Sequence, residues 1–185
     1  MTMQLLNLNE GGQVLATRDR GREAADRVQE ALDTGNALIL NFANVEVASP
    51  SFLDEILTRL RGILTADGSA VVVVTGLNQD VSESLEMVLA HRKMVVAALK
   101  DDAVELIGGP RQLTETLAAA SKLGKFKATE LADELKIKLP NLHQRLKALT
   151  ETGAVGRRID TTATSGRRYD YFTFDPKEAK DLVGA

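Results

Sequence analysis

The sequence predicts an α/β protein in two parts, an N-terminal α/β sandwich and a smaller C-terminal unit of helices and a hairpin. Three observations support this expectation. In residues 1–108, apolar runs of strand length alternate with stretches whose apolar residues recur every three or four positions, as in a sheet covered by helices. From residue 109 the order changes to helices followed by strands. The net charge changes sign at the same point.

The first part is expected to alternate strands with helices. Four consecutive valines in residues 70–75 predict a strand that is buried on both faces. Residues 94–99 and 103–107 are expected to pair as a hairpin around a charged turn. The other strands are expected over residues 3–8 and 37–42, and the helices over residues 16–32, 52–64 and 82–89.

The second part is expected to begin after Gly108 and Gly109, which loosen the backbone, with Pro110 suited to the start of a helix. Apolar spacing then predicts helices over residues 111–123, 129–135 and 140–150, and strands over residues 154–159 and 169–174. The inward residues of the first helix are expected to be Leu113, Leu117, Ala120 and Leu123. Three helices followed by a hairpin is the order of a winged helix-turn-helix domain. The expected domains are therefore residues 1–108 and 109–185.

The two parts differ in charge. Residues 1–108 contain 9 Lys and Arg against 16 Asp and Glu, a net charge of −7. Residues 109–185 contain 14 against 10, a net charge of +4. An acidic part joined to a basic one is typical of a regulatory body that carries a nucleic-acid-binding unit. A chance imbalance is the plain alternative.

The helix over residues 140–150 is the expected recognition helix. In a helix-turn-helix pair, the second helix enters the major groove of DNA. With its leucines turned inward, the opposite face carries Asn141, His143, Gln144 and Lys147. Asn and Gln side chains can pair with adenine, and His or Lys can reach guanine or phosphate. These four side chains are therefore the expected DNA-reading residues.

Four arginines flank the loop of the hairpin. Arg157 and Arg158 lie on the strand that enters the loop, and Arg167 and Arg168 lie on the side that leaves it. Guanidinium groups in such a position suit phosphates or a narrow minor groove. A solvated hairpin without a ligand is the alternative interpretation.

The C-terminal motifs resemble winged-helix regulators of the ArsR and MarR type. The resemblance rests on the segments 128–135, 142–149 and 151–155, which contain Glu-Leu-Ala, a leucine-ended helix, and a Gly followed one residue later by Val. It implies a regulator of transcription that binds double-stranded DNA. Palindromic sites favour two-fold symmetry, so a homodimer is expected.

The N-terminal segment 37–55 resembles a STAS-like family of unassigned function. A buried strand leads through Ser49, Pro50 and Ser51 into a helix with an acidic first turn. The wider STAS fold includes anti-sigma factor antagonists, in which a partner kinase phosphorylates a serine at this helix start. By register Ser51 matches that serine, so Ser51 is a candidate phosphorylation site, although Phe52 replaces the glycine that follows it there. A helix cap at Ser49 or Ser51 is the structural alternative.

Other classes of function are disfavoured. The chain has no Cys, and its two His residues stand far apart, so neither a metal nor a cofactor is expected. Asp54 and Glu55 are neighbours on a helix and do not face each other, which argues against an enzyme. No apolar run predicts a membrane span or signal peptide, so a cytoplasmic location is expected.

Two functions therefore remain open. The first is a DNA-binding regulator whose N-terminal module senses a signal, dimerises or binds a partner. The alternative is a partner-switch protein, similar to an anti-sigma factor antagonist, that docks on a regulatory protein or kinase and uses its winged helix for protein contacts.

Overall fold

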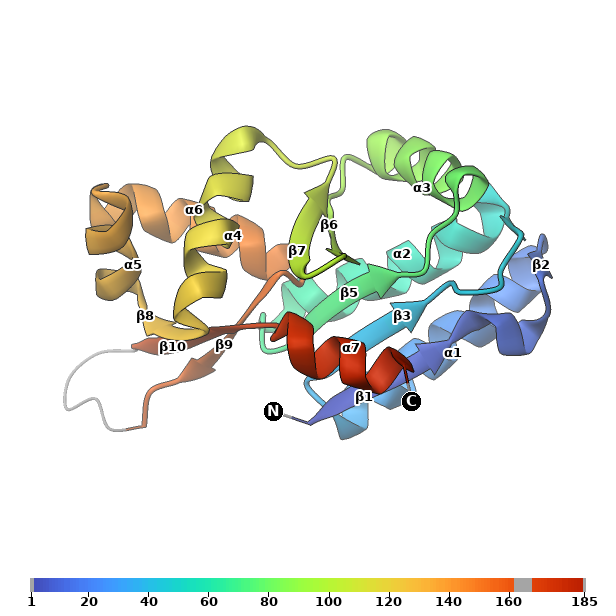
Figure 1. The fold of residues 1–185 in the computed structure, drawn as a ribbon, viewed down its shortest axis with the longest axis horizontal. Helices are drawn as coiled ribbons and strands as arrows, with labels where there is room; N and C mark the ends of the chain where they lie inside the picture. Colours follow the sequence, from blue (N-terminus) through green and yellow to red (C-terminus); the bar gives the residue numbers. More distant parts are fainter. Residues whose placement is uncertain (1, 162–167, 185) are drawn as a thin grey trace.

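A five-stranded sheet forms the centre of the N-terminal part (Figure 1). The structure is a computed structural model, and it describes residues 2–161 and 168–184. The strands follow one another across the sheet in the order β1-β3-β5-β6-β7, the first four parallel and the last antiparallel. Their bounds are β1 Met3–Asn7, β3 Ala37–Asn41, β5 Val71–Thr75, β6 Val96–Lys100 and β7 Ala103–Ile107.

Three helices connect the parallel strands and cover one face of the sheet. They are α1 Arg18–Thr34, α2 Pro50–Ala66 and α3 Gln79–Arg92. Connections between parallel strands are right-handed, and this strand order advances in one direction only, so all three helices fall on the same face. Accordingly, the helices share one hydrophobic cluster with alternate strand residues such as Leu38, Leu40 and Val72.

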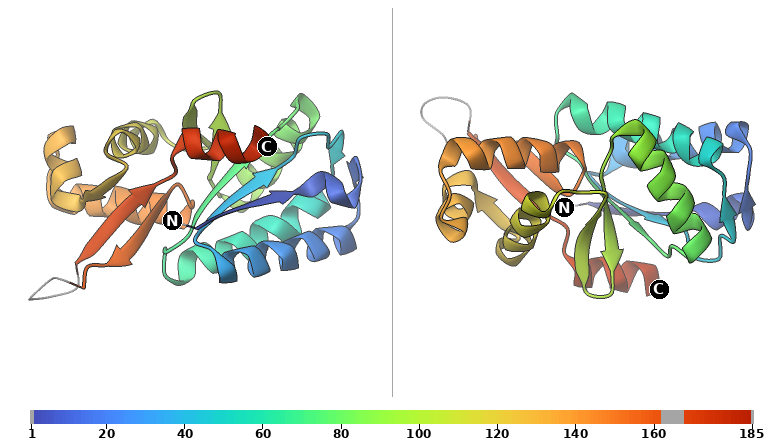
Figure 2. Two further views of the ribbon diagram at one scale, coloured as in Figure 1. Left: turned by 60° about the horizontal axis from the view of Figure 1, so that its bottom comes forward. Right: turned by 90° about the horizontal axis from the view of Figure 1, so that it is seen from above.

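The opposite face of the sheet is covered by the C-terminal part. Ala37, Ile39, Val71, Val73 and Ala97 point to this face, and none of them is exposed to solvent. They belong to a second hydrophobic cluster, which continues into the C-terminal helices and strands. In the left view of Figure 2, the last helix lies on the opposite side of the sheet from α1 and α2. The two parts of the chain therefore share a core.

The C-terminal part combines helices with a three-stranded antiparallel sheet of order β8-β10-β9. Its elements are α4 Arg111–Leu123, β8 Lys125–Lys127, α5 Ala128–Leu135, α6 Leu139–Glu151, β9 Val155–Ile159, β10 Tyr169–Thr173 and α7 Pro176–Gly184. Every helix and strand expected from the sequence is present. The sequence analysis did not predict β8 or α7.

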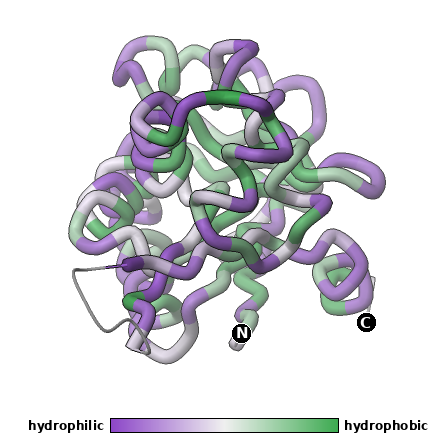
Figure 3. The backbone as a smooth tube through the Cα atoms, turned by 90° about the vertical axis from the view of Figure 1, so that its left-hand side faces the viewer, coloured by the Kyte–Doolittle hydropathy of each residue, from purple (hydrophilic) through white to green (hydrophobic). Residues whose placement is uncertain are grey.

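Three smaller elements also escaped prediction. A short helix spans Leu8–Gly11, and the strands β2 Val14–Leu15 and β4 Val47–Ala48 pair in parallel. Among the described residues, no helix has the length and apolar character needed to cross a membrane. Figure 3 shows hydrophobic segments in the interior and hydrophilic segments along much of the periphery.

The predicted mixed α/β class is confirmed, but one predicted core residue is wrong. Leu123 is 39% exposed, because it is the last residue of α4 and the chain turns away at Gly124. Thr116 is fully buried on that helix instead. Its hydroxyl donates to the carbonyl of Gln112 at 2.7 Å and accepts from Arg145 at 3.2 Å. Burial of this polar side chain is therefore satisfied by hydrogen bonds.

Candidate functional site

Helix α6 separates a buried stripe from an exposed polar face. Leu142, Leu146 and Leu149 are at most 1% exposed, and they anchor the helix in the second hydrophobic cluster. The expected DNA-reading residues all lie on the exposed side, and they are Asn141, His143, Gln144 and Lys147. Helical periodicity explains this separation, because the leucines recur at three- and four-residue intervals.

The turn before α6 adds two lysines that the sequence analysis missed. Lys136 ends α5 in the left-handed conformation, with φ 52° and ψ 41°. The amide of Ile137 donates to the carbonyl of Ala132 at 3.1 Å, which closes the turn. Lys136 and Lys138 are both exposed beside the start of α6. We call these two lysines, together with Asn141, His143, Gln144 and Lys147, the α6 surface.

Charge on the α6 surface is concentrated near the start of the helix. At the other end, Lys147 faces Glu151 at 4.0 Å, a distance at which the carboxylate offsets its charge. Arg145 turns inward and donates to Thr116, so it lies outside this surface. The first two turns of α6 are therefore the part best suited to an anionic ligand.

The β9–β10 hairpin reaches the same end of the molecule as the start of α6 (Figure 1). Arg158 is exposed, with its guanidinium 4.9 Å from the centre of the Phe172 ring. Arg168 is also exposed, and its carbonyl accepts from the amide of Asp160 at 2.9 Å. Arg167 lies outside the described residues. Two of the four expected arginines are thus available on this hairpin.

Arg157 has a different environment from Arg158 and Arg168. Its side chain is half-buried, and its Nε donates to the carbonyl of Asp67 at 2.8 Å. The same guanidinium lies 4.7 Å from the centre of the Tyr169 ring. Cation–π contact and a hydrogen bond both hold it against the protein. Arg157 therefore faces the N-terminal part, an arrangement that the spacing of arginines did not predict.

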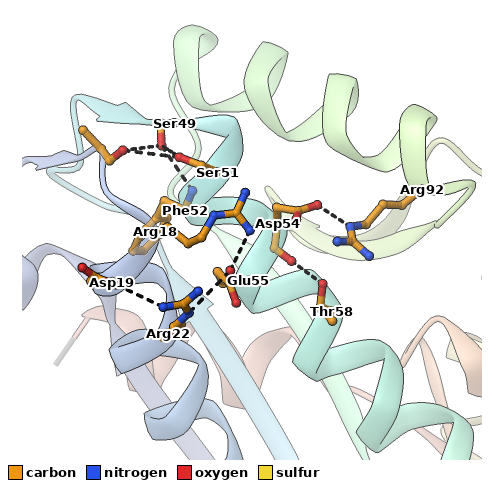
Figure 4. Close-up of polar contacts among 11 residues, drawn as sticks. Arg18, Asp19, Arg22, Ser49, Ser51, Phe52, Asp54, Glu55, Thr58 and Arg92 are labelled. Carbon is orange, nitrogen blue, oxygen red and sulfur yellow. Dashed lines mark hydrogen bonds and ion pairs between the residues drawn. The ribbon is translucent and has the colours of Figure 1, made fainter.

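Ser49 caps helix α2 (Figure 4). Its hydroxyl accepts from the amide of Phe52 at 3.2 Å and donates to the carbonyl of Ala16 at 2.9 Å. The structural alternative, a helix cap, is confirmed for Ser49. Ser51 lies in the first turn of α2, half-buried, with its hydroxyl 3.0 Å from that of Ser49. Phosphorylation of Ser51 stays a prediction.

The carboxylates of α2 form ion pairs with two neighbouring helices (Figure 4). Glu55 lies 2.9 Å from Arg18 on α1, whereas Asp54 pairs with Arg92 on α3. The hydrogen bond from Arg92 lowers the pKa of Asp54 below its ordinary value, against the opposing effect of burial. Asp54 and Glu55 therefore serve different helix contacts and do not form a facing acid–base pair.

Two grooves lie elsewhere on the sandwich. One, of about 970 Å³, lies between α3 and the β6–β7 hairpin, and its lining includes Leu89, Met94 and Ile107. The other, of about 690 Å³, separates α1 from α2. No group of His, Asp or Glu side chains within residues 2–161 and 168–184 could hold a metal ion.

Comparison of the chain with protein-family models, with curated proteins and with solved structures returned no match.

Proposed function

We propose that the protein binds double-stranded DNA through the α6 surface and the β9–β10 hairpin, and that it regulates transcription. The observation that carries the proposal is the division of α6 described above. One side is a fully buried leucine stripe, and the other presents Asn141, His143 and Gln144. These residue types form paired hydrogen bonds with base edges in the major groove.

The surroundings of α6 support the same proposal. Lys136 and Lys138 stand beside its first turn, and Arg158 and Arg168 lie on the hairpin at the same end of the molecule. Lysine and arginine contacts with phosphates supply most of the sequence-independent affinity for DNA. The order of α4, α5, α6 and the hairpin fits a winged helix-turn-helix unit, and the sheet with its three helices fits a STAS-like sandwich.

A homodimer fits this proposal. One recognition helix reads a short half-site, and two-fold symmetry doubles the number of bases that are read. In this arrangement the sandwich serves dimerisation or the binding of a regulatory partner.

The experiment is selection of double-stranded DNA from a random pool by the full-length protein. We expect an enriched motif, and we expect Gln144→Ala to relax the preference at one base position and to weaken binding by about tenfold. The matched control is Gln112→Ala, a change of the same kind at an exposed position on α4. If no motif is enriched and the protein retains no DNA at low salt, the proposal is wrong.

A second candidate function is partner switching through Ser51. Since Ser49 already supplies the cap of α2, the Ser51 hydroxyl is not needed for that role. A phosphate on the first turn of this 17-residue helix would also be stabilised by the helix dipole. The test is incubation with the kinase encoded beside the gene, followed by mass spectrometry. Absence of a phosphate on Ser51, in a reaction where a known substrate is labelled, argues against this function.

A further inference from the structure

A small set of contacts joins the β9 strand to the end of α2. The amide of Arg157 donates to the carbonyl of Gly68 at 2.9 Å, and its Nε donates to the carbonyl of Asp67 at 2.8 Å. Close by, the amide of Val72 donates to the carbonyl of Gly153 at 2.9 Å. We call these five residues the joint. It connects the N-terminal sandwich to the strand that leads into the hairpin.

Two glycines give the joint its close packing. Gly68 has φ +69°, and a Cβ there would lie 3.1 Å from Nε of Arg157. Gly153 has φ +74°, and a Cβ there would lie 3.2 Å from the amide nitrogen of Val72 and from the side chain of Leu64. Both positions need glycine for the backbone conformation as well as for space. The joint is thus a built contact between the two parts of the chain.

The joint is connected to both components of the proposed DNA surface. Thr150, near the end of α6, would lie 3.1 Å from a Cβ on Gly68. Arg157 lies on β9, and its guanidinium contacts Tyr169 on the partner strand β10. The turn after α2 therefore contacts the end of the recognition helix and both strands of the hairpin.

We propose that Arg157 is a positioning residue, which orients the β9–β10 hairpin relative to α6 by holding it to the turn after α2. A phosphate contact would require its guanidinium to leave the carbonyl of Asp67 and the ring of Tyr169. The role in DNA binding rests on the proposed function, whereas the coupling between Gly68 and the hairpin is measurable without DNA.

The DNA-free experiment uses tyrosine fluorescence. The chain has two Tyr and no Trp, and both tyrosines, Tyr169 and Tyr171, lie on β10. Gly68→Ala changes the N-terminal side of the joint, and we expect it to alter tyrosine emission and its quenching by acrylamide. The control is Gly62→Ala on α2, where a Cβ meets nothing within 4 Å and φ is negative. We expect that control to match the parent protein.

The conservative change Arg157→Lys guards against misfolding of the Gly68 variant. It keeps the positive charge but loses the Nε donor and the planar group that covers Tyr169. We expect the same direction of fluorescence change, with circular dichroism like that of the parent. Unchanged tyrosine emission and quenching in both folded variants would overturn the proposal, whether or not the protein binds DNA.

The DNA experiment compares Arg157→Lys, Arg168→Ala and the double variant on the selected motif. If Arg157 orients the hairpin, each single change weakens binding by about tenfold, and the double variant is little worse than either one. If Arg157 is an independent phosphate contact, Arg157→Lys retains most of the affinity and the effects of alanine at both positions multiply. That second result overturns the positioning role. If the parent binds no DNA, the proposed function fails, and the fluorescence experiment still decides the coupling.

Discussion

The shared core predicts that a change in the central sheet will destabilise the C-terminal part. Ile39 on β3 is fully buried and points to the face that the C-terminal elements cover. Ile39→Ala removes three carbon atoms, at about 0.8 kcal/mol each for lost burial, or about 2.4 kcal/mol. The cavity left behind raises the expected loss in free energy of unfolding to about 3–4 kcal/mol. For a chain of this size, the midpoint of thermal unfolding should fall by about 10 °C.

The assay follows unfolding with two probes at once. Circular dichroism reports on all helices, whereas tyrosine fluorescence reports only on β10, since Tyr169 and Tyr171 are the two tyrosines of the chain. We expect both probes to give one transition, shifted equally by Ile39→Ala. Leu40→Ala, on the opposite face of the same strand, should also shift both. A tyrosine transition that stays at the parent midpoint in Ile39→Ala refutes the shared core and indicates two independently folding domains.

Three further predictions concern single residues. Burial raises the pKa of Tyr171 above its ordinary value of 10.0, so its stabilising effect is complete below about pH 10 and is lost as the pH rises toward the raised pKa. Tyr171→Phe should keep the stack with Phe126 and reduce the loss of thermal stability between about pH 9 and pH 11, and an unchanged pH profile contradicts this. Lys136→Gly should raise the free energy of unfolding by about 0.5 kcal/mol, because glycine adopts the left-handed conformation without strain; a loss in urea denaturation speaks against it. Ser49→Ala should cost about 1 kcal/mol as the cap is lost, and Ser51→Ala much less; equal losses by the same assay rule out this division.

Elements with a strong apolar period could be predicted from the sequence. The leucines of α6 and the valines of β5 recur in patterns that only one kind of element satisfies. By contrast, β8 has three residues, of which Phe126 alone is buried, and a pattern this short carries no period. Similarly, α7 buries Ala179 and little else, so its spacing gave too weak a signal.

The candidate site was predictable only in part, for a physical reason. Exposure of Asn141 and Gln144 follows from the period of their own helix. The orientation of Arg157 depends on the carbonyl of Asp67, which lies 90 residues earlier in the chain. Burial of β3 and β5 on both faces was likewise evident from composition, but the elements that cover the second face depend on tertiary packing. Local pattern predicts which side chains a helix exposes, and long-range contacts decide what they face.

The central claim is that the α6 surface and the hairpin bind DNA through charge and base contacts together. The most direct measurement is the salt dependence of binding to the selected motif, by fluorescence anisotropy, for the parent, Arg168→Ala and Arg61→Ala. Arg61 is an exposed arginine on α2, away from the proposed surface. We predict a steep linear fall of log affinity with log salt, a slope reduced by about one unit in Arg168→Ala, and no change in Arg61→Ala. A parent slope near zero, or equal slopes for all three proteins, contradicts the account.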